Sequence, residues 1–194
     1  MKKLLLSVMA ALAMVVSFTS CKCTGGKTAG ETTTVEQVIA NDREHVSLNY
    51  GGEYRWFETN VVLKNWLDEE VDDSVDEIVN IFQVQTVISP TVTDVFVYYY
   101  RHAADSLTID EYHGFIVGDR PLNDDEILVP FKQAYEKVQA SNYVKPHSRQ
   151  VVLRKEPGTV EANAQWIFGN QDAQLYVDTK TGAVRDTNPA YEDE

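Results

Sequence analysis

Cysteine is scarce in this chain: its 194 residues include only two, Cys21 and Cys23, both close to the N-terminus. No disulfide can form within the remainder of the chain, so a hydrophobic core must hold the fold together. Basic residues are also few, because 17 Lys and Arg stand against 30 Asp and Glu and give a formal net charge of −13. Such a surface repels the phosphate backbone of nucleic acids, so nucleic-acid binding is not expected.

Long hydrophobic runs are missing as well. The apolar run over residues 4–16 is shorter than the ~20 residues that a membrane-spanning helix needs. Lys2 and Lys3 precede this run, and a mostly small-residue stretch leads from it to Cys21, so residues 1–20 have the pattern of a secretory signal peptide. The segment resembles a bacterial lipoprotein signal, in the Ser-Cys-Lys variant common in the Bacteroidetes group.

The lipoprotein resemblance implies cleavage before Cys21 and lipid attachment to that residue. Several acyl chains would make the membrane anchor stable. Lys22 follows the cysteine, where surface-exported lipoproteins of this type often carry an acidic pair, so an outer- or inner-membrane lipoprotein facing the periplasm is expected. Ordinary signal cleavage beside two unrelated cysteines is the alternative. Cleavage removes two lysines and no acid, which moves the formal charge from −13 to −15.

The chain beyond the anchor divides by composition into a tether and two structured units. Residues 21–33 are rich in Gly, Thr and Lys without apolar periodicity, which predicts a flexible tether. Residues 34–122 are expected to form an N-terminal α+β unit and residues 123–194 a C-terminal one. The fold class predicted is α+β, with short helices packed on antiparallel β meanders.

Two helices are predicted in the N-terminal unit. Thr34 and Gln37 resemble a capping box and predict a helix from 35 to about 45. Residues 53–66 favour a strand, although a helix is the alternative there. Ser74 and Glu77 form a second capping box after seven acids in residues 68–77, which predicts a helix start rather than a metal site. Its apolar face would be formed by Val75, Ile78, Val79 and Phe82.

β patterns follow, interrupted by one clear helix. Strands are predicted over 84–88, 93–102 and 107–117. Pro130 suits the first position of a one-faced helix of about 12 residues that ends near Ser141. The remaining strands are predicted at 148–155, 161–168, 174–178 and 183–185.

Residues 127–185 resemble the PepSY domain family. The matching segments are the helix PFKQAYEKVQAS, the strands VVLRKE and QWIFG, and the closing segment LYVDTKTGAV. In the closing segment, Asp178 can accept backbone N–H bonds across a turn, and Gly182 can supply the positive φ of a tight reversal. The resemblance implies a PepSY-like unit in a lipoprotein of Bacteroidetes type.

An upstream segment at about 74–118 looks like a degenerate second copy. At an offset of 68 residues, Asp110 and Gly114 take the places of Asp178 and Gly182. If the two segments are copies, the chain contains two PepSY-like units packed into one structure. A chance match between two hairpins is the alternative.

No catalytic, metal or cofactor signature stands out. The four histidines, His45, His102, His113 and His147, form no close metal-binding pair in the sequence. Residues 110–113 could supply a metal or base cluster, but a solvated turn explains them more simply. No catalytic residue, metal ligand or cofactor is therefore assigned.

Aromatic residues in the predicted strands are the best candidates for a binding surface. Strand aromatics are most often core, and core is the favoured reading for each one taken alone. Those assigned tentatively to a binding face are Trp56, Tyr98, Tyr100 and Trp166.

The expected function is that of a lipid-anchored envelope module without enzymatic activity. It would bind or inhibit a peptidase or another envelope protein, since PepSY-like modules are thought to bind or restrain partners. The alternative is a lipoprotein that binds a glycan or small molecule through sheet aromatics.

Overall fold

The computed structural model describes residues 33–50, 54–89, 92–104, 106–116, 120–158 and 162–191. All of them belong to one compact unit, Thr33–Glu194. Its two α-helices are α1 (Val35–Tyr50) and α2 (Phe131–Ala140), and two short 3₁₀ turns lie at Leu67–Glu69 and Asp124–Glu126. The strands are β1 (Tyr54–Leu63), β2 (Val75–Ser89), β3 (Val92–Ala103), β4 (Ser106–His113), β5 (Gln150–Arg154), β6 (Gln165–Asn170), β7 (Ala173–Asp178) and β8 (Val184–Arg185).

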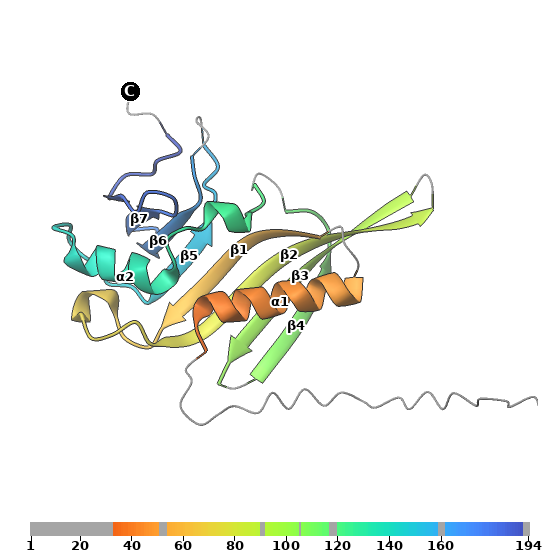
Figure 1. Ribbon diagram of the computed structural model, residues 1–194, viewed down its shortest axis with the longest axis horizontal. Coiled ribbons are helices and arrows are strands. Elements are labelled where there is room, and N and C mark those ends of the chain that lie inside the picture. Colours follow the sequence, from red (N-terminus) through yellow and green to blue (C-terminus); the bar gives the residue numbers. More distant parts are fainter. Residues whose placement is uncertain are drawn as a thin grey trace, which may run out of the picture. The chain divides into compact units, whose positions relative to one another are not determined.

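The eight strands form one antiparallel sheet in the order β4-β3-β2-β1-β5-β6-β7-β8. Each helix precedes a four-strand meander, and the two meanders join where β1 pairs with β5, from Thr59 opposite Leu153 to Val62 opposite Gln150. Figure 1 shows α1 lying along the first meander and α2 beside the second. The predicted α+β class, with helices on antiparallel meanders, is confirmed.

Both helices pack on the same face of the sheet. Val35, Ile39 and Val46 of α1 share one buried cluster with Phe131 and Val138 of α2. The sheet contributes large side chains to this cluster, and its largest fully buried members are Trp166, Tyr100, Phe82 and Phe168. No described helix is long and apolar enough to cross a membrane.

A buried polar network ties α1 to the sheet. Asp42 lies in the packed stripe of α1 between Ile39 and Val46 and is only 3% exposed. Its carboxylate accepts hydrogen bonds from Asn80 Nδ2 at 2.7 Å and from His102 Nε2 at 2.8 Å. Thr59 Oγ1 in turn donates to Asn80 Oδ1 at 2.5 Å. A buried hydrogen-bond network therefore occupies a position where an amphipathic helix usually places another apolar side chain.

The first helix begins where the capping box predicted and ends later than expected. Thr34 N donates to Gln37 Oε1, and Gln37 N donates to Thr34 Oγ1. The helix runs to Tyr50 rather than to about 45, because Val46 is buried and the Tyr50 ring lies 4.3 Å from that of Tyr98.

The helix predicted from Ser74 is wrong, because residues 75–89 form the strand β2. Ile78 and Phe82 face the helices, while Val79 and Ile81 belong to a cluster on the opposite face. With both faces buried, apolar side chains also fall at helical spacing, and the alternation that indicates a strand is hidden. Glu77 pairs with Arg101 of β3 instead of capping a helix.

The second half follows the predicted order closely. Pro130 is the N-cap of α2 rather than its first residue, and the helix ends at the C-cap Ser141. The four predicted strands appear as β5 to β8. The 68-residue offset aligns β3 with β6 and β4 with β7, so it pairs the fourth strand of one meander with the third of the other.

Candidate functional site: the open face of the sheet

The four aromatics assigned tentatively to a binding surface are core residues. Trp56, Tyr98, Tyr100 and Trp166 are 3%, 5%, 0% and 0% exposed, and all four lie in the cluster between sheet and helices. Burial raises the pKa of the Tyr98 and Tyr100 hydroxyls. None of the four is available to a ligand, because both helices cover this face.

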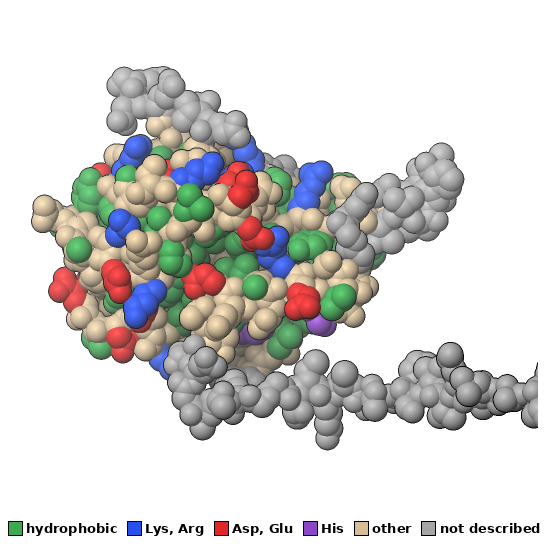
Figure 2. Space-filling model, in the orientation of Figure 1, with side chains coloured by type: hydrophobic (Ala, Val, Ile, Leu, Met, Phe, Trp, Pro, Cys, Tyr) green, Lys and Arg blue, Asp and Glu red, His purple; other side chains and the backbone are tan. Residues whose placement is uncertain are grey.

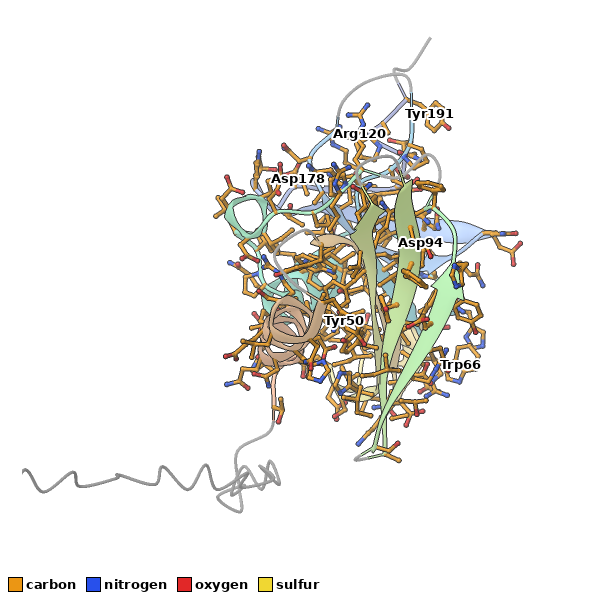
Figure 3. All side chains as sticks on the ribbon, turned by 90° about the vertical axis from the view of Figure 1, so that its right-hand side faces the viewer. Tyr50, Trp66, Asp94, Arg120, Asp178 and Tyr191 are labelled. Atoms are coloured by element: carbon orange, nitrogen blue, oxygen red, sulfur yellow. The ribbon has the colours of Figure 1, made fainter. Side chains whose placement is uncertain are left out.

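The opposite face of the sheet carries no helix, and we call it the open face. Side chains directly opposite on neighbouring strands share a face, so the strand register assigns its members. In Figure 3, Tyr50 of α1 lies on one side of the strands and Trp66 on the other. The open face comprises Arg55, Glu58, Asn60, Val62, Glu77, Val79, Ile81, Gln83, Gln85, Val95, Val97, Tyr99, Arg101, Ala103, Ser106, Thr108, Asp110, Tyr112, Gln150, Val152, Arg154, Gln165, Ile167, Gln174, Tyr176, Asp178 and Arg185.

The cations of the open face are of one kind. The eight described strands contain four arginines and no lysine, although lysine is common in the rest of the chain. All four arginines point to the open face: Arg55, Arg101, Arg154 and Arg185. Figure 2 shows the other, helix-covered side of the molecule, where acidic and basic side chains are interspersed without a patch of one sign.

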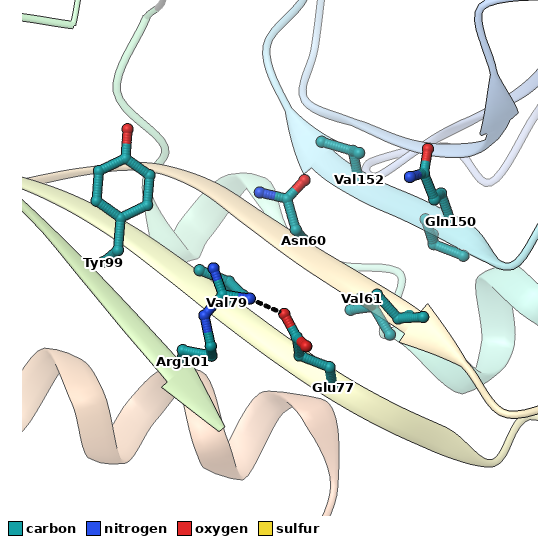
Figure 4. A pocket seen from close by; sticks show the side chains of 10 residues that line it. Asn60, Val61, Glu77, Val79, Tyr99, Arg101, Gln150 and Val152 are labelled. Atoms are coloured by element: carbon teal, nitrogen blue, oxygen red, sulfur yellow. Dashed lines mark hydrogen bonds and ion pairs between the residues drawn. The ribbon is translucent and has the colours of Figure 1, made fainter. Parts of the chain in front are cut away.

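A hollow of about 290 Å³ lies on the open face across β3, β2, β1 and β5. Figure 4 shows Tyr99, Arg101, Glu77, Asn60 and Gln150 around it, with an ion pair between Arg101 and Glu77. Tyr99 is held edge-to-face by Tyr112 of β4, with ring centroids 5.4 Å apart and an interplanar angle of 86°. The apolar floor is formed by the valines whose side chains face this side of the sheet, Val62, Val79 and Val152.

A second hollow of about 410 Å³ continues from the first, since Val62 and Gln150 line both. Its main feature is Trp66, 39% exposed, which is stacked on His147 with ring centroids 4.1 Å apart and planes 6° from parallel. Asp68 holds the imidazole through a contact of 2.9 Å to His147 Nδ1. We call the two hollows together the groove.

The segment after β4 packs over part of the open face beside the groove. Ile116 N donates to Gln83 Oε1 at 3.1 Å. The Ile116 side chain packs against Val79, Ile81 and Val97, which are 6%, 9% and 6% exposed. Part of the open face is therefore covered by this segment, and the groove lies beside the covered part.

The closing turn of the second meander is built as the sequence indicated. Asp178 accepts backbone N–H bonds from Lys180 at 2.9 Å and Thr181 at 2.8 Å, and Gly182 has φ +71°. Burial favours the neutral Asp178 carboxyl, but hydrogen bonds from Asn163, Thr181 and Lys180 outweigh it and lower the pKa of Asp178 below 3.8. These residues shape a turn.

The first meander lacks the equivalent turn. Asp110 lies inside β4, paired with Tyr99, instead of preceding a reversal. Gly114 has φ +139° directly after β4, and its N–H still bonds to Val95 O at 3.0 Å. The strand continues past Asp110 because Tyr98, Val97 and Phe96 still provide pairing partners there.

Each histidine has a different polar partner. His45 bonds to Tyr100, His102 to Asp42 and His147 to Asp68, while His113 lies 3.4 Å from Asp94. Among the described residues, no group of three His, Cys, Asp or Glu side chains could share a metal ion. Cys21, the expected lipid site, lies outside the described residues.

Sequence reasoning missed the groove. The distribution of cations could not be read from the sequence alone, because the predicted strands 53–66 and 148–155 include Lys64 and Lys155, which lie just outside β1 and β5. Comparison with known proteins adds no assignment: no family model, curated protein or solved structure matches the chain.

Proposed function

We propose that this protein is a lipid-anchored binding module of the bacterial cell envelope, and that the open face of its sheet binds another envelope protein. The single observation that carries the proposal is the composition of that face. It combines arginine, tyrosine and β-branched apolar residues without lysine. Interfaces between proteins are enriched in arginine and tyrosine and depleted in lysine, because a planar guanidinium and a rigid ring lose little entropy on contact.

The geometry of the groove supports a protein partner. Arg101 has a side chain 44% exposed, so its guanidinium can donate to a partner's carbonyl or carboxylate while Glu77 holds its position. Tyr99 provides a ring fixed by Tyr112, and the valine floor provides apolar area. A partner with an apolar ridge flanked by hydrogen-bond acceptors would complement this surface.

We also propose that the protein is located in the cell envelope and that its second half is PepSY-like. The signal-like residues 1–20 and Cys21 support export and lipid attachment on the periplasmic side. The order of α2 and β5 to β8, with Asp178 and Gly182 at the last turn, supports a PepSY-like second half. A peptidase is the partner class that this relation favours.

Binding rather than catalysis is proposed because the candidate reactive groups have structural partners. Asp42 and His102 join α1 to the sheet, and His147 supports the Trp66 ring. Each of these two pairs therefore stabilises the packing of the elements that it joins.

Variants on the two faces test the proposal. A Tyr99→Ala/Arg101→Ala protein should bind envelope proteins, and inhibit any peptidase among them, about tenfold or more weakly than the unaltered protein. The control is Lys132→Ala/Glu136→Ala on exposed positions of α2. Equal losses in both variants, or an unaltered protein that recovers no partner and affects no envelope protease, would contradict the proposal.

A glycan or small molecule is the second candidate, favoured by the Trp66–His147 stack. A flat, half-exposed ring beside Ser148, Gln150 and Asn170 suits a ligand with an apolar face and hydroxyl groups. Trp56 and Trp166 are buried, so quenching of tryptophan fluorescence by a glycan would report on Trp66. Quenching that is lost in Trp66→Phe would support this candidate, and an unchanged spectrum across a glycan panel would remove it.

A further inference from the structure

The strand β4 forms a free edge of the sheet. In the described part of the chain it pairs with β3 alone, from Ser106 opposite Ala103 to His113 opposite Phe96. This pairing runs without a register shift, whereas the β1–β2 pair contains two and the β2–β3 pair contains one. Figure 3, turned to this side of the molecule, shows β4 in front of the other strands. The opposite edge strand, β8, has only two residues.

Few of the usual devices protect the β4 edge. Natural proteins blunt such edges with lysine, proline, bulges or very short strands, because unpaired N–H and C=O groups attract another strand. The sequence SLTIDEYH has eight residues with no lysine, proline or glycine. Leu107 and Tyr112 are 47% and 57% exposed on it, so part of its apolar surface also faces solvent.

The pairing register identifies the backbone groups that point outward. Gly114 N donates to Val95 O at 3.0 Å, which places Gly114 and Val95 in a hydrogen-bonded pair. Such pairs alternate along an antiparallel ladder, so residues 106, 108, 110 and 112 direct their backbone groups to β3. Leu107, Ile109, Glu111 and His113 therefore direct theirs away from the sheet.

The charge of β4 selects its partner. Asp110 and Glu111 lie next to each other in its second half, and the strand has no lysine or arginine. If two copies paired antiparallel through these residues, carboxylates would face carboxylates across the ladder, in molecules of net charge −13. A strand carrying lysine or arginine would instead place opposite charges across the same ladder.

From these observations we propose that the outer edge of β4 binds an extended, basic segment of a partner protein as a ninth strand of the sheet. Leu107, Ile109, Glu111 and His113 would supply the main-chain bonds, and Asp110 with Glu111 would supply the charge preference. This site is separate from the open-face groove and does not rest on the function proposed for it.

Peptide binding followed by NMR tests this directly, with the intact protein in a zwitterionic detergent. The probe is an eight-residue peptide alternating lysine with valine or threonine, and the control peptide replaces each lysine with glutamate. We expect the basic peptide to shift the amide signals of β4 most strongly. N-methylation of alternate peptide nitrogens should lower its affinity about tenfold or more, because those N–H groups form the new ladder.

Charge variants complete the test. Asp110→Lys should weaken binding of the basic peptide about tenfold at low salt, and Asp125→Lys, an equal change at an exposed position outside the sheet, should weaken it far less. The proposal is overturned if the N-methylated peptide binds as well as the parent, if both lysine variants weaken binding equally, or if the shifts cluster outside β4. A dimer of the protein alone that is broken by Leu107→Pro would also overturn it, in favour of pairing between copies.

Discussion

Asp178 shows what a single carboxylate does in this fold. It accepts hydrogen bonds from the backbone of Lys180 and Thr181 and from the side chain of Asn163, so one residue closes the last turn and ties it to the segment before β6. The carboxylate is bound in its charged form, and its stability contribution therefore depends on pH.

Replacing Asp178 with alanine should lower the free energy of unfolding by about 1–2 kcal/mol near neutral pH, because several hydrogen bonds to a partly solvated carboxylate are lost. The pKa of Asp178 is lowered on folding. The stability contribution of Asp178 is therefore present when the pH is above the ordinary aspartate pKa near 3.8. It is lost as the pH falls through the lower pKa that Asp178 has in the folded protein. Urea unfolding of both proteins at several pH values measures this. A difference that stays constant down to pH 2 would contradict the account.

Turn residues illustrate which single positions the sequence can predict. Asp178 and Gly182 act within four residues of each other, so the local pattern contains the necessary information. Asp110 and Gly114 have the same spacing, but Asp110 pairs with Tyr99 on a neighbouring strand. That pairing depends on a distant part of the chain, which a local turn pattern does not include.

At the scale of elements, α1 and β2 depend on each other. The packed side of α1 has few apolar residues, and Asp42 at its centre binds Asn80 of β2 and His102 of β3. The helix is therefore positioned by these polar bonds in addition to its apolar contacts.

Asp42→Ala should destabilise the protein by about 2–3 kcal/mol, because buried Asn80 and partly buried His102 would each lose a partner. Glu44→Ala, at an exposed position on the same helix, should change stability by less than about 0.5 kcal/mol. Chemical denaturation compares the two variants. Hydrogen exchange should show faster opening of α1 in Asp42→Ala alone. Equal stability and exchange in both variants would show that the Asp42 hydrogen bonds do not stabilise the position of α1.

The β2 strand shows why elements with two buried faces are hard to predict. Its residues 78–84 are all buried, with Asn80 and Gln83 as the polar exceptions. A run without exposed positions fits helical spacing as well as strand alternation, and the preceding acids then favour the helix. In contrast, α2 buries one side only, through Phe131, Ala134, Tyr135 and Val138, and its period could be read directly.

At the scale of the whole molecule, the architecture separates a helix-covered face of the sheet from an open face. Both helices cover one side of the sheet, so the large aromatics assigned tentatively to a binding face lie in the core, which was the favoured reading for each one taken alone. The α+β class and the strand order of the second half were predictable from periodicity and turns. The groove was not, because its residues come from β1, β2, β3 and β5 and from the loops at residues 66 and 147.

The proposed anchor gives a further prediction. Cys21→Ser should abolish incorporation of a labelled fatty acid and release the protein from the membrane fraction, because the lipid is the proposed attachment. Cys23→Ser, two residues away, should leave both unchanged. Fractionation after metabolic labelling measures this, and membrane attachment that survives Cys21→Ser would show that something else holds the protein there.

Photo-crosslinking in living cells tests the central claim most directly, that a partner binds on the open face. A photoreactive amino acid would replace Tyr112 or Gln150 on the open face, and Glu136 on the helix-covered side as the control; all three positions are exposed. The account predicts discrete crosslinks to a protein from positions 112 and 150 and none from 136. Crosslinks from position 136 alone, or equally from all three positions, would contradict it.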